Sequence, residues 1–172
     1  VEPKIAQGKT NDVNPGTALP GQLVTYTLIT NNSNASYVSI AHDTVIVDHV
    51  PVGVTPVDAS SVPLADGAVV PGTGGAVWNS AARTITSSPV DINPNSSVIW
   101  TYKATVDIPA INGSKFTNTA DAKTTSISGN NPDERTAAST TNTGYIGASS
   151  STITVRGSTI TKEVDPAWVT IG

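Results

Sequence analysis

Alternation of apolar and polar residues along the chain predicts a protein built mainly from β-strands. The clearest runs are residues 22–30 (QLVTYTLIT) and 98–108 (VIWTYKATVDI), where apolar or aromatic side chains recur at every second position. In the first run, Val24, Tyr26 and Leu28 share one face, as expected of a strand with one buried side. Gly and Pro interrupt these runs, which favours an all-β sandwich with many turns.

The same pattern predicts the remaining strands and the loops between them. Strands are expected at residues 4–10, 37–50 (one long strand or two short ones), 76–79 and 83–86 as a hairpin, 115–127 and 150–156. Turns are expected at residues 11–21, 51–75 and 89–97, and a long polar excursion at residues 128–149. Trp78 and Trp100 fall inside strand patterns, so we expect them in the core rather than on a ligand platform.

Composition narrows the class of protein and its partners. The 172 residues are 37% hydrophobic and only 13% charged, and the net charge is −4. We expect no nucleic-acid partner, because no basic patch is evident, and no membrane insertion, because no apolar run is long enough. The absence of cysteine excludes disulfides and thiolate metal sites. A cysteine-free chain rich in Ser, Thr and Asn favours an extracellular location on a bacterial cell surface.

Three polar residues fall on the inward faces of separate expected strands: Lys9, Asp48 and Asn118. Residues two apart share a face of a strand, and both Asp48 and Asn118 have apolar neighbours two positions away on each side. Lys9 shares its face with Ile5, whereas Lys4 has the opposite parity and should point outward. An unpartnered polar group in an apolar core is costly, so the three side chains are expected to meet.

Burial would give this cluster a chemistry. It lowers the pKa of an amine and raises that of a carboxyl group, so Lys9 would become a neutral nucleophile and Asp48 would keep its proton. Attack of Lys9 Nζ on Asn118 Cγ, promoted by Asp48, would expel ammonia and leave a Lys–Asn isopeptide bond. Two alternatives remain: a noncovalent cluster, or no cluster, with Lys9 exposed, Asp48 capping a turn and Asn118 bonded to a loop.

Several short motifs occur in an order that resembles a known family. They are Lys9-Thr10, residues 21–27 (GQLVTYT), residues 48–51 (DHVP), residues 118–120 (NTA), and residues 133–136 (DERT) with Tyr145. The chain is similar to tandem repeat domains of bacterial surface proteins of the type called domain of unknown function eleven, and to isopeptide-forming domains of fimbrial subunits and adhesins. The resemblance implies an immunoglobulin-like β-sandwich with Greek-key antiparallel strands. It also implies a crosslink between Lys9 and Asn118, promoted by Asp48.

The start of the sequence pattern recurs near its end. Residues 162–166 (KEVDP) echo residues 9–15 (KTNDVNP) at a domain-length spacing. This predicts one repeat domain over residues 1–157, followed by residues 158–172 as the first strand of a next repeat or a strand exchanged with a neighbouring subunit. Trp168 would then lie at a domain junction.

Other candidate chemistry is weaker. Two histidines, His42 and His49, are more typical of surface or core positions than of a metal site. Asp133 and Glu134 are candidate calcium ligands in a loop, but their spacing is irregular, so no cofactor or metal is expected. No nucleophile-elbow or phosphate-binding motif occurs, so the chain is expected to be no enzyme beyond a single self-crosslinking turnover.

The expected function is a structural repeat module of a bacterial cell-surface fibre, stalk or filament such as a pilus, whose partners are neighbouring repeats or subunits. One alternative is an adhesin domain that binds a host or surface ligand, a glycan or a protein. Another is a filament subunit that assembles by strand addition through residues 159–172.

Overall fold

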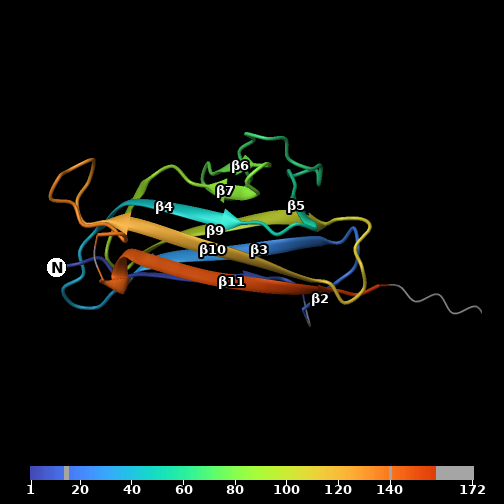
Figure 1. The fold of residues 1–172 in the computed structure, drawn as a ribbon, viewed down its shortest axis with the longest axis horizontal. Helices are drawn as coiled ribbons and strands as arrows, with labels where there is room; N and C mark the ends of the chain where they lie inside the picture. The colour runs from blue at the N-terminus through green and yellow to red at the C-terminus, as the bar shows by residue number, and fades with distance from the viewer. Residues whose placement is uncertain (14–15, 140, 158–172) are drawn as a thin grey trace, which may run out of the picture.

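In the computed structural model, two β-sheets pack face to face (Figure 1). The structure describes residues 1–13, 16–139 and 141–157. One sheet contains, in spatial order, β1 (Ile5–Asn11), β3 (Leu23–Asn32), β9 (Ser96–Val106) and β5 (Val54–Pro56). The other contains β2 (Thr17–Ala18), β11 (Ile146–Val155), β10 (Lys115–Thr125), β4 (Ala41–His49), β7 (Thr84–Thr86) and β6 (Val77–Asn79). β8 (Val90–Ile92) also pairs with β4, and a 3₁₀ turn, η1 (Thr143–Tyr145), precedes β11.

The predicted immunoglobulin-like β-sandwich is confirmed. The chain passes between the sheets from β3 to β4, from β4 to β5 and from β9 to β10, so sequential strands often lie in opposite layers. The pairings are antiparallel with one exception, because Thr17 and Ala18 of β2 run parallel to the end of β11. The second sheet is therefore mixed rather than purely antiparallel.

The core lies between the sheets and follows the predicted alternation. Val24, Tyr26 and Leu28 of β3 are buried, and their neighbours in sequence are not. Trp78 and Trp100 are each 2% exposed, which confirms that they pack in the core.

Three short strands, β2, β5 and β8, occupy segments predicted as loops. β5 pairs with the end of β9, and β8 pairs with β4. β5 and β8 are only three residues long and have a proline in the strand or directly before it, and β2 has only two residues. None of them presents a run long enough for a periodic pattern. Pro56 is tolerated because β5 is an edge strand.

β11 begins at Ile146, four residues before the predicted strand. Its early inward position is Gly147, which carries no apolar side chain to mark the pattern. A Cβ atom at Gly147 would lie 2.8 Å from Ile5 Cγ2 and 3.1 Å from Gln7 Cβ. The close approach of β1 and β11 therefore requires glycine at the position where the alternation fails.

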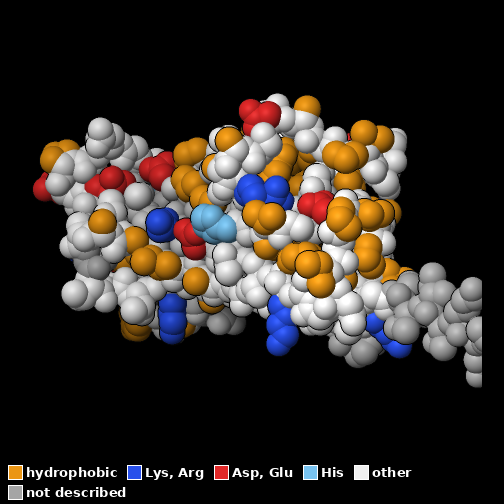
Figure 2. Space-filling model, turned by 45° about the vertical axis from the view of Figure 1, so that its right-hand side comes forward, with side chains coloured by type: hydrophobic (Ala, Val, Ile, Leu, Met, Phe, Trp, Pro, Cys, Tyr) orange, Lys and Arg blue, Asp and Glu red, His pale blue; other side chains and the backbone are white. Residues whose placement is uncertain are grey.

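The surface carries dispersed charge. On the face seen in Figure 2, Lys and Arg side chains lie among acidic, hydrophobic and other side chains rather than in one patch. Among the residues that the structure describes, no helix has the length and apolar character needed to cross a membrane. Residues 158–172, including Trp168, lie outside the described part of the chain, so the expected domain boundary stays a prediction.

Candidate functional site

Lys9 lies inside the sandwich, as its strand parity predicts. Ile5 and Lys9 are buried on the inward face of β1, and the Lys9 side chain is 0% exposed. Lys4 is exposed. The antiparallel register places Lys9 beside Leu28 of β3, so β1 is held as a regular strand up to the lysine.

Asp48 reaches the same space from the opposite sheet. It lies on the inward face of β4, is 0% exposed, and pairs across the strands with Ala120 of β10. Its Oδ2 atom contacts Lys9 Nζ in a buried ion pair that joins the two sheets. The structure thus brings together two of the three residues selected from the sequence.

Asn118 is fully buried on β10 and is connected to Asp48 through a fourth residue, Tyr102 of β9. Asn118 Nδ2 donates to the Tyr102 hydroxyl at 2.7 Å. The same hydroxyl donates to Asp48 Oδ2 at 3.0 Å. The three predicted residues therefore belong to one buried hydrogen-bonded cluster.

Sequence reasoning did not identify Tyr102 as a member of this cluster. It lies two residues after Trp100 and is buried on the same inward face of β9, but neither its place in the cluster nor the partner of its hydroxyl was predicted. A signal was available, because a buried tyrosine hydroxyl usually finds a hydrogen-bond partner. The Asp48 and Asn118 side chains were the polar groups expected in the same core.

Aromatic rings surround the lysine. Tyr26 and Tyr102 stack with their ring centroids 5.5 Å apart. Lys9 Nζ lies 5.1 Å from the Tyr26 centroid and 5.6 Å from the Tyr102 centroid. The ring faces attract a cation electrostatically, but they cannot replace the hydration shell that the amine loses on burial.

Burial shifts the acid and the amine in opposite directions. Desolvation lowers the pKa of the Lys9 amine, and the neighbouring Asp48 carboxylate only partly offsets this. Desolvation likewise raises the pKa of Asp48, against the opposing effects of Lys9 and of the Tyr102 hydrogen bond. Both shifts favour a neutral pair, with the proton on the carboxyl group and the amine free to act as a nucleophile.

Two oxygens of the cluster have no hydrogen-bond partner in the described structure: Asp48 Oδ1 and Asn118 Oδ1. A buried acceptor without a donor is costly. Protonation of Asp48 would supply a donor where there is now none. The unpartnered oxygens are therefore consistent with the neutral pair that burial favours.

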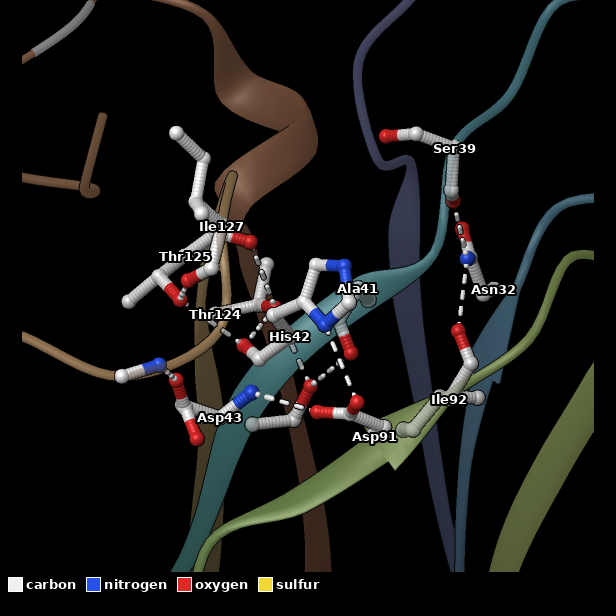
Figure 3. A network of polar contacts seen from close by, with 12 residues as sticks. Asn32, Ser39, Ala41, His42, Asp43, Asp91, Ile92, Thr124, Thr125 and Ile127 are labelled. Atoms are coloured by element: carbon white, nitrogen blue, oxygen red, sulfur yellow. Dashed lines mark hydrogen bonds and ion pairs between the residues drawn. The ribbon is translucent and has the colours of Figure 1, made fainter. Parts of the chain in front are cut away.

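A second buried asparagine, Asn32 of β3, has different surroundings (Figure 3). Its Nδ2 donates to Ser39 O at 2.8 Å and to Ile92 O at 2.9 Å. Its Oδ1 accepts from Lys4 N at 3.0 Å. The Asn32 amide is fully used in connecting backbone segments, whereas the carbonyl of the Asn118 amide is not.

The histidines pair with acidic residues outside this cluster. His42 Nδ1 contacts Asp91 Oδ2 at 2.9 Å, as Figure 3 shows, and His49 Nε2 contacts Asp121 Oδ1 at 2.7 Å. Both are pairs at the surface of the second sheet.

The candidate calcium ligands Asp133 and Glu134 lie in a turn after β10. Asp133 is exposed, and its backbone nitrogen donates to Asn131 Oδ1 within a turn. Glu134 is half-buried, and its backbone nitrogen donates to Asn131 O. Within residues 1–13, 16–139 and 141–157, no three or more His, Cys, Asp or Glu side chains gather in a way that could hold a metal ion.

Comparisons with known proteins support the fold. No protein-family model matches the sequence, and no curated protein matches it. A variant of BcpA, the major pilin subunit of Bacillus cereus, has a similar structure with a TM-score of 0.50 at 14% identity, over 91% of this chain and 41% of that one. The chain thus spans less than half of the BcpA structure it matches.

Two further solved structures are less similar. The major pilin SpaD of Corynebacterium diphtheriae has a TM-score of 0.45 at 14% identity, over 86% of this chain and 33% of that one. AvmM, which catalyses macrocyclization in alchivemycin A biosynthesis, has a TM-score of 0.49 at 10% identity, over 92% of both chains. At such identities the likeness to BcpA establishes a shared sandwich architecture and no function.

Proposed function

We propose that this chain is a structural module of a bacterial cell-surface fibre, stalk or filament, stabilised by an intramolecular isopeptide bond between Lys9 and Asn118. The observation that carries this proposal is the buried cluster in which Lys9 contacts Asp48 and Asn118 reaches the same carboxylate through one hydroxyl. No external enzyme is involved, because folding itself places and desolvates the reacting groups.

The chemistry follows from the opposite pKa shifts. A neutral Lys9 amine attacks Asn118 Cγ, and the protonated Asp48 carboxyl group stabilises the charge that develops as the carbonyl bond opens. Ammonia leaves, and a secondary amide joins the two side chains. Amides are poor electrophiles, so the reaction depends on the fixed geometry that the two packed sheets supply.

The position of the proposed bond suits a domain that is pulled from its two ends. The described chain enters at one end of the sandwich and leaves at the other (Figure 1). A bond from β1 to β10 would connect the first strand to a late one, so tension between the ends would bypass residues 10–117. A noncovalent contact already joins β1 to β11, the last strand, since Asn11 Nδ2 donates to Ser151 Oγ at 2.7 Å.

Exposed apolar side chains lie in the loop between β9 and β10, beside the last described residue. They support contact with a following domain. Ile108 and Ile111 are 75% and 77% exposed in the loop between β9 and β10. Gly157, the last described residue, donates its backbone N–H to Asn112 Oδ1 in the same loop at 2.8 Å. A next repeat of the domain of unknown function eleven type would emerge beside this apolar loop.

Intact-protein mass spectrometry tests the crosslink. The folded chain should have a mass one ammonia below that of its sequence, and Lys9→Ala should show no such loss. Lys4→Ala is the matched control, because Lys4 belongs to the same region and is exposed; it should still lose ammonia. An unmodified mass in folded wild-type protein would remove the crosslink from the proposal.

A second candidate is an adhesin domain that binds a ligand, favoured by one surface feature. A hollow of about 540 Å³ lies between the ends of β4 and β10 and the loop that precedes β11. Its lining includes Val45, Ile146 and the loop residues Thr136, Ala137 and Ala138. Glycan arrays with and without a chelator would test this candidate, with a chain whose residues 136–138 are replaced by charged residues as the control. Binding lost in that variant would favour the adhesin.

Strand addition is the third candidate. The segment that would be exchanged, residues 159–172, lies outside the described residues, so the candidate rests on the sequence. A monomer at all concentrations in analytical ultracentrifugation would argue against it.

A further inference from the structure

A continuous line of contacts runs from the proposed nucleophile to the proposed leaving group. Lys9 Nζ contacts Asp48 Oδ2. That same oxygen accepts from the Tyr102 hydroxyl at 3.0 Å. The Tyr102 oxygen in turn accepts from Asn118 Nδ2 at 2.7 Å. The nitrogen that must lose a proton is thus connected, through one carboxylate oxygen and one hydroxyl, to the nitrogen that must gain one.

We propose that Tyr102 is a proton relay in the crosslinking reaction. It carries a proton from Asp48 to the departing nitrogen of Asn118, and Lys9 replaces the proton that Asp48 has given up. This inference rests on the crosslink proposed above and assigns a second residue, besides Asp48, to its chemistry. It also explains why a tyrosine, rather than another aromatic residue, occupies this fully buried position on β9.

The step balances without an outside reagent. Lys9 Nζ forms a bond to Asn118 Cγ, and the carbonyl electron pair moves onto Oδ1. The protonated Asp48 passes its proton to the Tyr102 oxygen while Tyr102 gives its own proton to Nδ2. The Asp48 carboxylate formed in this way then takes a proton from Lys9 Nζ. The Oδ1 electron pair re-forms the carbonyl, the Cγ–Nδ2 bond breaks, and neutral ammonia leaves. Asp48 and Tyr102 end in the protonation states in which they began.

The direction of the hydrogen bonds changes during this sequence for a chemical reason. In the intact amide, the nitrogen lone pair is delocalised, so Nδ2 can only donate, as it does to Tyr102. Once Cγ becomes tetrahedral, the lone pair is localised and Nδ2 can accept a proton. The Tyr102 hydroxyl can then turn from Asp48 to Nδ2 without moving the ring.

Tyr26 provides a matched control. Its ring stacks on that of Tyr102 and is fully buried as well. Its hydroxyl lies near the Asn118 amide but makes no hydrogen bond of good geometry and none to Asp48 in the described structure. Tyr26→Phe and Tyr102→Phe therefore remove the same atom from the same ring stack, but only Tyr102→Phe interrupts the line of contacts between the two nitrogens.

The experiment follows crosslinking in time. The full chain is prepared unfolded, with Lys9 and Asn118 unreacted, and is transferred to folding buffer. Folding is monitored by tryptophan fluorescence, and loss of ammonia by mass spectrometry. We expect Tyr26→Phe to crosslink at the wild-type rate. We expect Tyr102→Phe to fold first and then to crosslink about 10²-fold more slowly, which is typical of losing a proton-transfer group.

A second variant separates a relay from a role in packing. A difluorotyrosine incorporated at position 102 keeps the ring and the hydroxyl but makes the hydroxyl more acidic. A relay predicts a changed crosslinking rate and an altered dependence of that rate on pH. This variant also keeps the test decisive if Tyr102→Phe does not fold.

The outcomes test the crosslink and the relay separately. If folded wild-type protein keeps its full mass, the crosslink itself is refuted. If wild type crosslinks and Tyr102→Phe reacts as fast as Tyr26→Phe, the relay is overturned and the crosslink stands. An unchanged rate and pH profile with difluorotyrosine at position 102 would overturn the relay as well.

Discussion

Asn32 and Asn118 are both buried asparagines on inward faces of the sandwich, yet their amides are bonded in opposite ways. The Asn32 amide makes three hydrogen bonds to backbone atoms, and its oxygen is satisfied. The Asn118 amide makes one hydrogen bond to a side chain, and its oxygen has no partner in the described structure. The first arrangement stabilises a fold, and the second leaves a carbonyl available for reaction.

This difference predicts that replacing the two asparagines has different effects on the intact mass and on the free energy of unfolding. Asn118→Ala should restore the full mass and lower the free energy of unfolding by about 4–5 kcal/mol, because a crosslink that closes a loop of roughly 100 residues restricts the unfolded chain by that amount. Asn32→Ala should keep the ammonia loss and cost about 1–3 kcal/mol, because it leaves buried backbone groups without partners. Intact mass and denaturant unfolding check both. Ammonia loss in Asn118→Ala would contradict the assignment.

The pKa of Asp48 provides a test by titration. Burial raises it above the ordinary value of 3.8, whereas Asp91 has a lowered pKa because the Asp43 backbone N–H donates to it. In a carboxyl ¹³C NMR titration, Asp91 should therefore titrate below 3.8 and Asp48 above it. Crosslinking removes the Lys9 charge that opposes the shift, so Asp48 should titrate higher in wild type than in Asn118→Ala.

The same shift has a consequence for stability. A carboxyl group with a raised folded-state pKa stays protonated in the native state while the unfolded state loses its proton. The contribution of Asp48 to stability is thus fully present below a pH of about 3.8, the ordinary pKa of the group. It is lost as the pH rises through the folded-state pKa. Asp91 has the opposite sign, and its contribution is lost as the pH falls. Coincident titration of Asp48 and Asp91 would argue against the buried neutral pair.

Pulling the molecule by its ends should reveal where the covalent bond lies. In wild type, the segment between Lys9 and Asn118 cannot extend under tension. In single-molecule force spectroscopy, the contour length released by Asn118→Ala should exceed that of wild type by roughly 350–390 Å, at the extended length of a residue. Asn32→Ala should give the short wild-type increment. Equal increments in wild type and Asn118→Ala would exclude a Lys9–Asn118 bond.

The seam between β1 and β11 should control how well Lys9 is placed. Because a Cβ atom at Gly147 would lie 2.8 Å from Ile5 Cγ2, Gly147→Ala should push β1 away from β11 and cost about 1–3 kcal/mol. We expect slower ammonia loss in this variant. Gly67→Ala is the control for glycine removal, because a Cβ atom there meets nothing within 4 Å. Its left-handed backbone, with φ of +77°, should reduce stability, and the rate of ammonia loss in the folded protein should stay at the wild-type value.

The fold class and the inward residues of the long strands could be predicted because both depend on local periodicity. In β3, β4 and β10, side chains alternate between core and surface, so parity alone identified the inward Asp48 and Asn118 and separated Lys9 from Lys4. Short strands such as β5 and β8 could not be predicted, because three residues next to prolines show no period.

The sequence by itself determined which side chains enter the core and predicted that Lys9, Asp48 and Asn118 would meet there, but not the contacts through which they are joined. That Asn118 would reach Asp48 through the Tyr102 hydroxyl, and that Asn32 would be satisfied by backbone atoms, were decided by the packing of two sheets. Alternation sets the face of a strand, whereas contacts across the core depend on strand order, register and the separation of the sheets. Lys9 and Asp48 are 39 positions apart in the chain, Tyr102 and Asp48 are 54 apart, and Asn11 and Ser151 are 140 apart, so no local pattern contains these contacts.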